Sequence, residues 1–153
     1  MTVKPRILFI CTANAARSQM AEGYLRAKYG DLYESFSAGT RQSSVSTRAI
    51  AVMQEIGIDI SHHRSKTLQS VRDEPFDLAV TLCDNAHVIC PIVPGAKKTI
   101  HKGFFDPHLT PGTGEELLDG YRRVRDEIAA WIDSEFGSGE ASKISFAGSK
   151  YER

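Results

Sequence analysis

The chain has 153 residues, 41% of them hydrophobic and 25% charged, which is enough for one domain with a buried core. Its 19 basic residues equal its 19 acidic residues in number. The chain therefore lacks the excess of positive charge that is typical of proteins that bind nucleic acid or acidic membranes. No apolar run approaches the roughly 18 residues of a membrane-spanning helix, and the run after residue 5 is too short for a secretory signal. These features predict a cytoplasmic protein without a nucleic-acid or membrane partner.

Strand and helix patterns alternate along the chain. Apolar runs typical of strands occupy residues 6–10, 36–38, 76–83 and 97–101. Helical patterns occupy residues 18–28, 46–57, 67–71 and 115–136. This alternation predicts an α/β domain over residues 1–136, in which a four-stranded parallel sheet has helices on both faces in a three-layer αβα arrangement. The segment 137–153 is rich in small residues and is predicted to be a flexible tail.

Two of these helices have a predicted core face. In the helix that begins at Ser46 and stops at Gly57, helical spacing places Ile50, Met53 and Ile56 on the apolar side. In the last helix, the residues predicted to face the core are Leu118, Tyr121, Val124, Ile128 and Trp131 or Ile132.

Cys11 directly follows the first strand and stands six positions before Arg17. In a loop between a strand and a helix, consecutive backbone N–H groups can surround a tetrahedral oxyanion, and an arginine can bind two of its oxygens. The same positive field favours the thiolate of Cys11, and Ser18 can hydrogen-bond to its sulfur. Asn14 suits a left-handed backbone conformation. The predicted oxyanion-binding residues are Thr12, Ala13, Asn14, Ala15, Ala16, Arg17 and Ser18.

The segment "CTANAARS", followed by "QMAEG", resembles the anion loop of low-molecular-weight protein tyrosine phosphatases and of the thioredoxin-coupled arsenate reductases that share their fold. The resemblance continues through "SAGT", "VMQEIGIDISHHRSK", "FDLAVTLCDNAHVICP" and "HKGFFDP", so it covers about residues 6–136. It implies the low-molecular-weight phosphatase fold, with Cys11 as the nucleophile, Arg17 as the anion-binding residue and Asp106 as the general acid.

The other two cysteines favour the reductase branch of the resemblance. Cys83 ends the third strand and Cys90 follows seven positions later, where the reductases carry thiols that a phosphatase does not need. The resemblance implies that Cys11 attacks arsenate, that Cys83 then forms a disulfide with Cys11 as arsenite leaves, and that Cys90 moves the disulfide to Cys83–Cys90. It also implies thioredoxin as the reductant, phosphate and sulfate as competing oxyanions, and no bound cofactor.

Two other functions stay open. The enzymatic alternative is hydrolysis of phosphate monoesters by Cys11, Arg17 and Asp106, although "DPHL" lacks the tyrosine pair that phosphatases usually carry after Asp-Pro. The non-enzymatic alternative is a thiol-based module that binds metal or arsenite through the three cysteines. It is disfavoured because Arg17 repels cations and the cysteines lack paired C-x2-C spacing.

A potassium site occurs in some reductases of this type. Asn14, Glu22 and Ser37 match that pattern, but Lys66 stands where a carboxylate would help to bind the ion. The sequence therefore predicts no resident metal.

Overall fold

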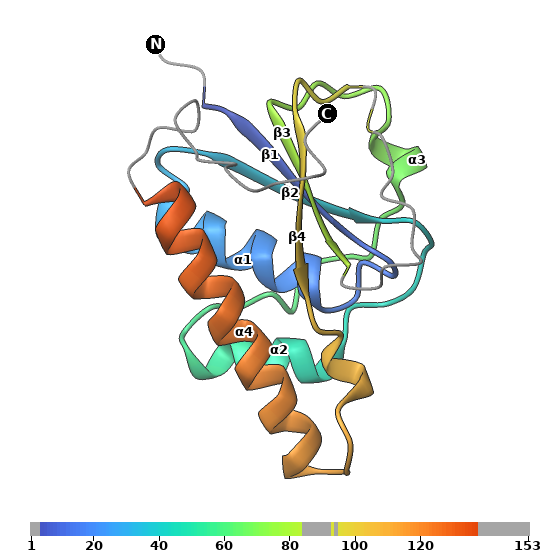
Figure 1. Ribbon diagram of the computed structural model, residues 1–153, viewed down its shortest axis with the longest axis vertical. Coiled ribbons are helices and arrows are strands. Elements are labelled where there is room, and N and C mark those ends of the chain that lie inside the picture. The colour runs from blue at the N-terminus through green and yellow to red at the C-terminus, as the bar shows by residue number, and fades with distance from the viewer. Residues whose placement is uncertain (1–3, 84–92, 94, 138–153) are drawn as a thin grey trace.

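The computed structural model describes residues 4–83, 93 and 95–137 of the chain. Four parallel strands form one sheet in the order β2-β1-β3-β4 (Figure 1). They are β1 (Arg6–Cys11), β2 (Glu34–Gly39), β3 (Leu78–Cys83) and β4 (Thr99–Phe104). The predicted α/β fold with a four-stranded parallel sheet is therefore confirmed.

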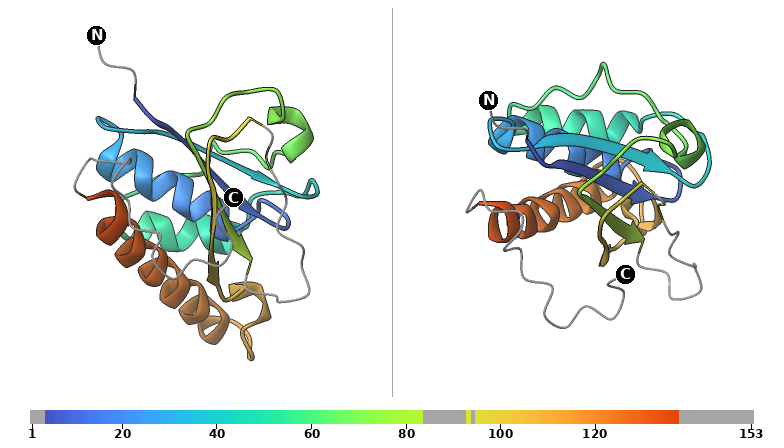
Figure 2. Two further views of the ribbon diagram at one scale, coloured as in Figure 1. Left: turned by 45° about the horizontal axis from the view of Figure 1, so that its top comes forward. Right: turned by 90° about the horizontal axis from the view of Figure 1, so that it is seen from above.

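Helices cover the sheet unequally. They are α1 (Arg17–Tyr29), α2 (Thr47–Glu55), the short α3 (Leu68–Val71) and α4 (Glu115–Phe136), with a 3-10 turn η1 (Pro107–Leu109) before α4. The helices α1 and α4 pack against each other on one face of the sheet, and α2 packs against both (Figures 1 and 2). On the opposite face α3 lies against β2. Within the described part of the chain, no helix combines the length and the apolar character needed to cross a membrane.

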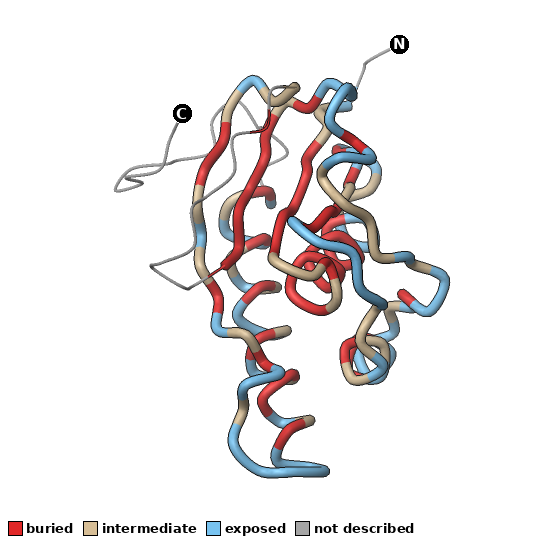
Figure 3. Tube along the Cα trace, turned by 90° about the vertical axis from the view of Figure 1, so that its right-hand side faces the viewer, coloured by how far each residue is buried: buried red, intermediate tan, exposed pale blue. Residues whose placement is uncertain are grey.

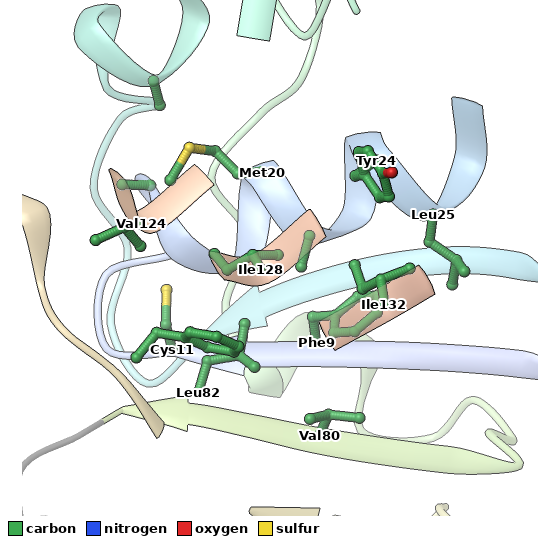
Figure 4. Packing of buried hydrophobic residues seen from close by; sticks show 14 of the residues in the cluster. Phe9, Cys11, Met20, Tyr24, Leu25, Val80, Leu82, Val124, Ile128 and Ile132 are labelled. Atoms are coloured by element: carbon green, nitrogen blue, oxygen red, sulfur yellow. The ribbon is translucent and has the colours of Figure 1, made fainter. Parts of the chain in front are cut away.

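Both faces of the sheet are buried, which explains why β1 and β3 are continuous apolar runs rather than alternating ones (Figure 3). In β1, Phe9 points into the larger core with α1 and α4, whereas Leu8 points into a smaller core with Val71 and Phe76. Figure 4 shows side chains of β1 and β3 meeting those of α1 and α4 in the larger core. The carboxyl ends of the central strands are thus held rigidly from both sides.

The helix α2 begins and ends where the sequence predicts. The Oγ of Ser46 accepts a hydrogen bond from the backbone N–H of Ala49 at 3.2 Å and so caps the first turn. At the other end Gly57 adopts a φ of +78°, and its N–H donates to the carbonyl of Gln54 at 2.9 Å. The glycine is needed there because a left-handed residue closes the helix.

The predicted core face of α2 is correct at Met53, in part at Ile50, which packs against the core, and wrong at Ile56. Its buried residues are Ala49, Val52 and Met53, whereas Ile50 is half-buried and Ile56 is 41% exposed. Ile56 caps the helix with a non-helical backbone, so its side chain leaves the helical spiral. Only a narrow stripe of α2 therefore faces the core.

Two of the residues predicted to face the core in α4 lie at the edge of its buried face. Its buried side chains include Leu117, Tyr121, Val124, Ile128, Ile132 and Phe136. The buried residues follow one another at intervals of three or four positions and form one face of the helix. Leu118 and Trp131 lie at the edge of that face and are half-buried.

Gly137 caps α4 by donating its backbone N–H to the carbonyl of Asp133. The rest of the predicted tail, 138–153, lies outside the described residues.

The fourth strand differs from the predicted segment 97–101. β4 runs from Thr99 to Phe104, because it pairs with β3 from Ala79 as far as Cys83, with one irregularity in register after Thr81. The strand therefore begins two residues later and ends three residues later than the predicted segment. This extension brings Phe104 to the same sheet edge as Cys83, and Asp106 follows two residues later.

Candidate functional site

The site lies where the order of strands reverses. The chain passes from β1 to β2 on one side and later returns to β3 on the other side, so the carboxyl ends of β1 and β3 are neighbours. Cys11 ends β1 and Cys83 ends β3, and their side chains are 2% and 7% exposed. The hydroxyl of Thr12 lies 3.3 Å from the sulfur of Cys83. The tertiary structure thus brings the second thiol to the loop of the first.

The loop 12–16 connects β1 to α1 and is held tightly against the end of β2. Asn14 has the left-handed conformation that the sequence suggests, with a φ of +51°. A Cβ on Gly39 would lie 2.7 Å from the backbone nitrogen of Asn14 and 2.8 Å from the carbonyl oxygen of Thr12. Only glycine permits this approach, so Gly39 shapes the loop from a distant part of the sequence. The hydroxyl of Ser65 also donates to the carbonyl of Ala13 at 3.0 Å.

The side chain of Asn14 is fully buried and uses all of its hydrogen-bonding capacity. Its Nδ2 donates to the hydroxyls of Ser18 and Ser37 at 2.8 and 2.9 Å. Its Oδ1 accepts from the side chain of Gln19 at 2.8 Å and from the backbone N–H of Lys66 at 2.7 Å. Because a backbone N–H only donates, Lys66 fixes which end of the amide is the oxygen.

This network determines the role of Ser18 at the nucleophile. The Oγ of Ser18 lies 2.9 Å from the sulfur of Cys11. Since Ser18 accepts a hydrogen bond from Asn14, its own hydrogen is left for the sulfur of Cys11. The predicted contact between Ser18 and Cys11 is therefore present, and Asn14 holds the Ser18 hydroxyl at the sulfur.

Sequence reasoning missed Gln19, which connects Asn14 to a histidine. Besides Asn14, the side chain of Gln19 donates to the carbonyl of Arg64 at 2.8 Å, and its Oε1 lies 2.8 Å from Nδ1 of His63. Arg26 lies 3.2 Å from Nε2 of the same ring. Because Arg26 only donates, His63 is neutral and carries its proton on Nδ1. Burial lowers the pKa of His63, and the charges of Arg26 and Lys66 lower it further.

Arg17 and Asp106 meet at the open side of the loop. The buried guanidinium of Arg17 donates to the carbonyl of Phe104 at 3.1 Å and lies 3.7 Å from a carboxylate oxygen of Asp106. The other oxygen of Asp106 accepts from the backbone N–H of His108 at 3.0 Å and caps η1. Asp106 therefore serves the Asp-Pro turn and also faces the site.

The site opens into a cavity of about 480 Å³. Of the predicted oxyanion-binding residues, those that line it are Thr12, Ala13, Ala15, Ala16 and Arg17, together with Cys11 and Asp106. Asn14 and Ser18 lie buried behind the loop instead. Within residues 4–83, 93 and 95–137, no acceptor takes a hydrogen bond from the backbone N–H groups of residues 12–16. Cys90, the third predicted thiol, lies outside the described residues.

The residues that match the potassium-site pattern lie close together, but cationic side chains of the protein already pair with their carboxylate. The buried carboxylate of Glu22 accepts from the hydroxyl of Ser37, lies 2.6 Å from Arg26 and lies 3.7 Å from the ammonium of Lys66. Burial lowers the pKa of Lys66, and Glu22 opposes that shift. Two side-chain cations already balance this one carboxylate, so the residues do not fit a potassium ion.

The chain matches the family described as low molecular weight phosphotyrosine protein phosphatase over residues 6–133. An arsenate reductase of Halalkalibacterium halodurans is 45% identical over 129 residues, which cover 84% of this chain and 93% of that protein. A solved arsenate reductase in a phosphate-binding state has a TM-score of 0.70 and 27% identity, and the match covers 92% of this chain and 99% of that one. The thioredoxin-dependent arsenate reductase of Corynebacterium glutamicum has a TM-score of 0.65 and 25% identity, covering 93% of this chain and 65% of that one.

Proposed function

Because this chain belongs to the low molecular weight phosphotyrosine protein phosphatase family, and to the arsenate reductases within it, we propose that it reduces arsenate by a relay of Cys11, Cys83 and Cys90 that thioredoxin regenerates. The observation that carries this proposal is the contact of 3.3 Å between the Thr12 hydroxyl and the sulfur of Cys83. It places a second thiol at the oxyanion loop, where a hydrolase needs none.

In the first step the loop captures arsenate. The N–H groups of residues 12–16 have no acceptor in the described chain and are available to the oxyanion, while Arg17, held by the carbonyl of Phe104, binds two of its oxygens. The thiolate of Cys11 attacks arsenic, so a sulfur–arsenic bond forms as one arsenic–oxygen bond breaks. Asp106 supplies a proton so that this oxygen leaves as water. Phosphate and sulfate have the same tetrahedral shape and compete for the loop.

In the second step the electrons move. The sulfur of Cys83 attacks the sulfur of Cys11 and breaks the sulfur–arsenic bond. The bonding electron pair stays on arsenic, which leaves as arsenite, reduced by two electrons. Cys11 and Cys83 lose those two electrons and form a disulfide. The loop needs no redox cofactor for this exchange, because the thiols supply both electrons.

In the third step the disulfide moves outward. Cys90 attacks Cys83, which releases the Cys11 thiolate for another cycle, and a dithiol of thioredoxin then reduces the Cys83–Cys90 disulfide. The thioredoxin-dependent relative from Corynebacterium glutamicum supports this choice of reductant. We place the cycle in the cytoplasm, whose reducing conditions keep the thiols available for exchange.

Arsenite production with and without thioredoxin tests this function. With arsenate, thioredoxin, thioredoxin reductase and NADPH, the protein should release many arsenite molecules per chain. Without thioredoxin it should stop after about one, because each chain then has only its own thiols. Hydrolysis of phosphate monoesters with no arsenite release would favour the phosphatase alternative. Stoichiometric arsenite binding without turnover would favour the thiol-based binding module.

Replacing Arg17 with lysine should slow arsenate reduction strongly. Lysine keeps the charge but lacks the planar fork that binds two oxygens of the anion. We expect a loss of about 2–4 kcal/mol of transition-state stabilisation, or roughly 30- to 1,000-fold in kcat/KM for arsenate. Arg123→Lys, at an exposed position of α4, is the matched control. A rate within a fewfold of wild type in Arg17→Lys would show that another group binds the oxyanion.

A further inference from the structure

The cavity above Cys11 is larger than its proposed inorganic substrate requires. Arsenate has only five non-hydrogen atoms, whereas a cavity of about 480 Å³ falls within the range of roughly 300–1,000 Å³ that is typical of sites for organic ligands. Beyond the oxyanion loop, residues of the segment 41–48 line the cavity together with Asp106, His108 and Tyr121. Within that segment Ser43, Ser44 and Thr47 carry hydroxyl groups. The cavity thus has room for a polar group attached to the oxyanion.

Two further arginines line this outer part. Arg41 is exposed and Arg48 is half-buried in the first turn of α2, and both belong to the cavity wall. Among the described residues, they and Arg17 place three guanidinium groups around the cavity, against one carboxylate, that of Asp106. A cleft lined mainly by one sign of charge concentrates ligands of the opposite sign.

The protein groups that the structure describes leave the guanidinium groups of Arg41 and Arg48 without an acidic partner. In the described part of the chain, their guanidinium groups have no hydrogen bond and no ion pair, although the backbone N–H of Arg41 donates to the loop carbonyl of Thr12 at 3.1 Å. Arg122 on α4, which is half-buried like Arg48, binds Glu55 at 2.7 Å and has further acidic partners. The positive charges of the cavity wall are therefore available to a ligand.

We propose that Arg41 and Arg48 form a second anion site. Because of this site, the protein prefers ligands in which a tetrahedral oxyanion is joined to a second anionic group. Phosphate and arsenate monoesters of a hydroxy acid are ligands of this kind. The tetrahedral group occupies the loop of Cys11 and Arg17, and the second anionic group faces Arg41 and Arg48. This inference rests on the oxyanion loop of the proposed function and adds the substrate class that the outer cavity selects.

Protection of Cys11 from alkylation tests this second site. Ethylphosphonate and 2-carboxyethylphosphonate share the tetrahedral group and differ by one carboxylate. The reduced protein is treated with iodoacetamide at low ionic strength, and alkylation of Cys11 is followed by peptide mass spectrometry. We expect 2-carboxyethylphosphonate to protect at a concentration roughly 4- to 25-fold lower, because each exposed ion pair contributes a factor of about two to five. Added salt should reduce this ratio.

Two variants separate the second site from a general effect of charge. In the double variant Arg41→Gln/Arg48→Gln the two ligands should protect within about twofold of each other. Arg123→Gln removes one charge from an exposed site on α4 and should keep the wild-type ratio. A wild-type ratio near one would overturn the second site, as would a ratio that persists in the double variant. If ethylphosphonate gives no protection of the wild-type protein, the oxyanion loop of the proposed function fails as well.

Discussion

Replacing Cys11 with serine is expected to abolish arsenite production, and any hydrolysis of phosphate monoesters with it. Serine is nearly the same size and can keep the contact with Ser18, but its hydroxyl is not ionised near neutral pH and cannot form a disulfide. The loss should therefore be complete within the detection limit of an arsenite assay.

A binding measurement shows whether the loop survives in this variant. The loop N–H groups and Arg17 are unchanged in Cys11→Ser, so phosphate should still raise its melting temperature. In wild type, the Cys11 thiolate should alkylate quickly near neutral pH, and phosphate, sulfate or arsenate should slow that reaction. If Cys11 alkylates like an ordinary thiol and oxyanions give no protection, then it is not the nucleophile.

Replacing the other two cysteines one at a time should stop the relay at different points. Cys83→Ser should release no arsenite, because nothing then attacks the sulfur of Cys11 after arsenic has bound. Cys90→Ser should release about one arsenite per chain and then stop, because the first two sulfurs suffice for one two-electron step. The number of arsenite molecules per chain, measured without reductant, separates the two variants.

The disulfide left behind identifies the order of attack. Cys90→Ser should accumulate a Cys11–Cys83 disulfide, which peptide mass mapping without reductant detects. Wild type treated in the same way should accumulate Cys83–Cys90, with Cys11 left to alkylate. Repeated turnover of Cys90→Ser with thioredoxin as the sole reductant would show that Cys90 is dispensable, and the three-cysteine relay would have to be abandoned.

The oxyanion loop was predictable from the sequence because its parts are consecutive. Cys11 and Arg17 are separated by five residues, and a strand before them and a helix after them position the loop through local backbone geometry. The left-handed conformation of Asn14 and the contact of Ser18 with Cys11 follow from the same short segment. Periodicity likewise predicted the strands and α-helices of the described residues, although with different bounds for β4, because burial on one or both faces leaves a regular pattern.

The support of that loop could not be predicted, since it comes from distant segments. Gly39 allows the loop to approach β2, and Lys66 fixes the orientation of the Asn14 amide, although they lie 25 and 52 positions from Asn14. The core face of α2 was also predicted incorrectly at Ile56, because periodicity does not reveal where a helix ends against its neighbours.

By itself, the sequence determined the order of the strands and helices, and it predicted an oxyanion loop with Cys11 as its nucleophile, because each depends on residues within a few turns of one another. Only the tertiary structure placed Cys83 beside Thr12, since that contact needs β3 to pair with β1 across 71 positions of sequence. It also extended β4 toward Asp106 and turned Arg41 and Arg48 into the wall of one cavity. These contacts join residues that are far apart in the sequence, and they form only when the strands pair in the assembled chain.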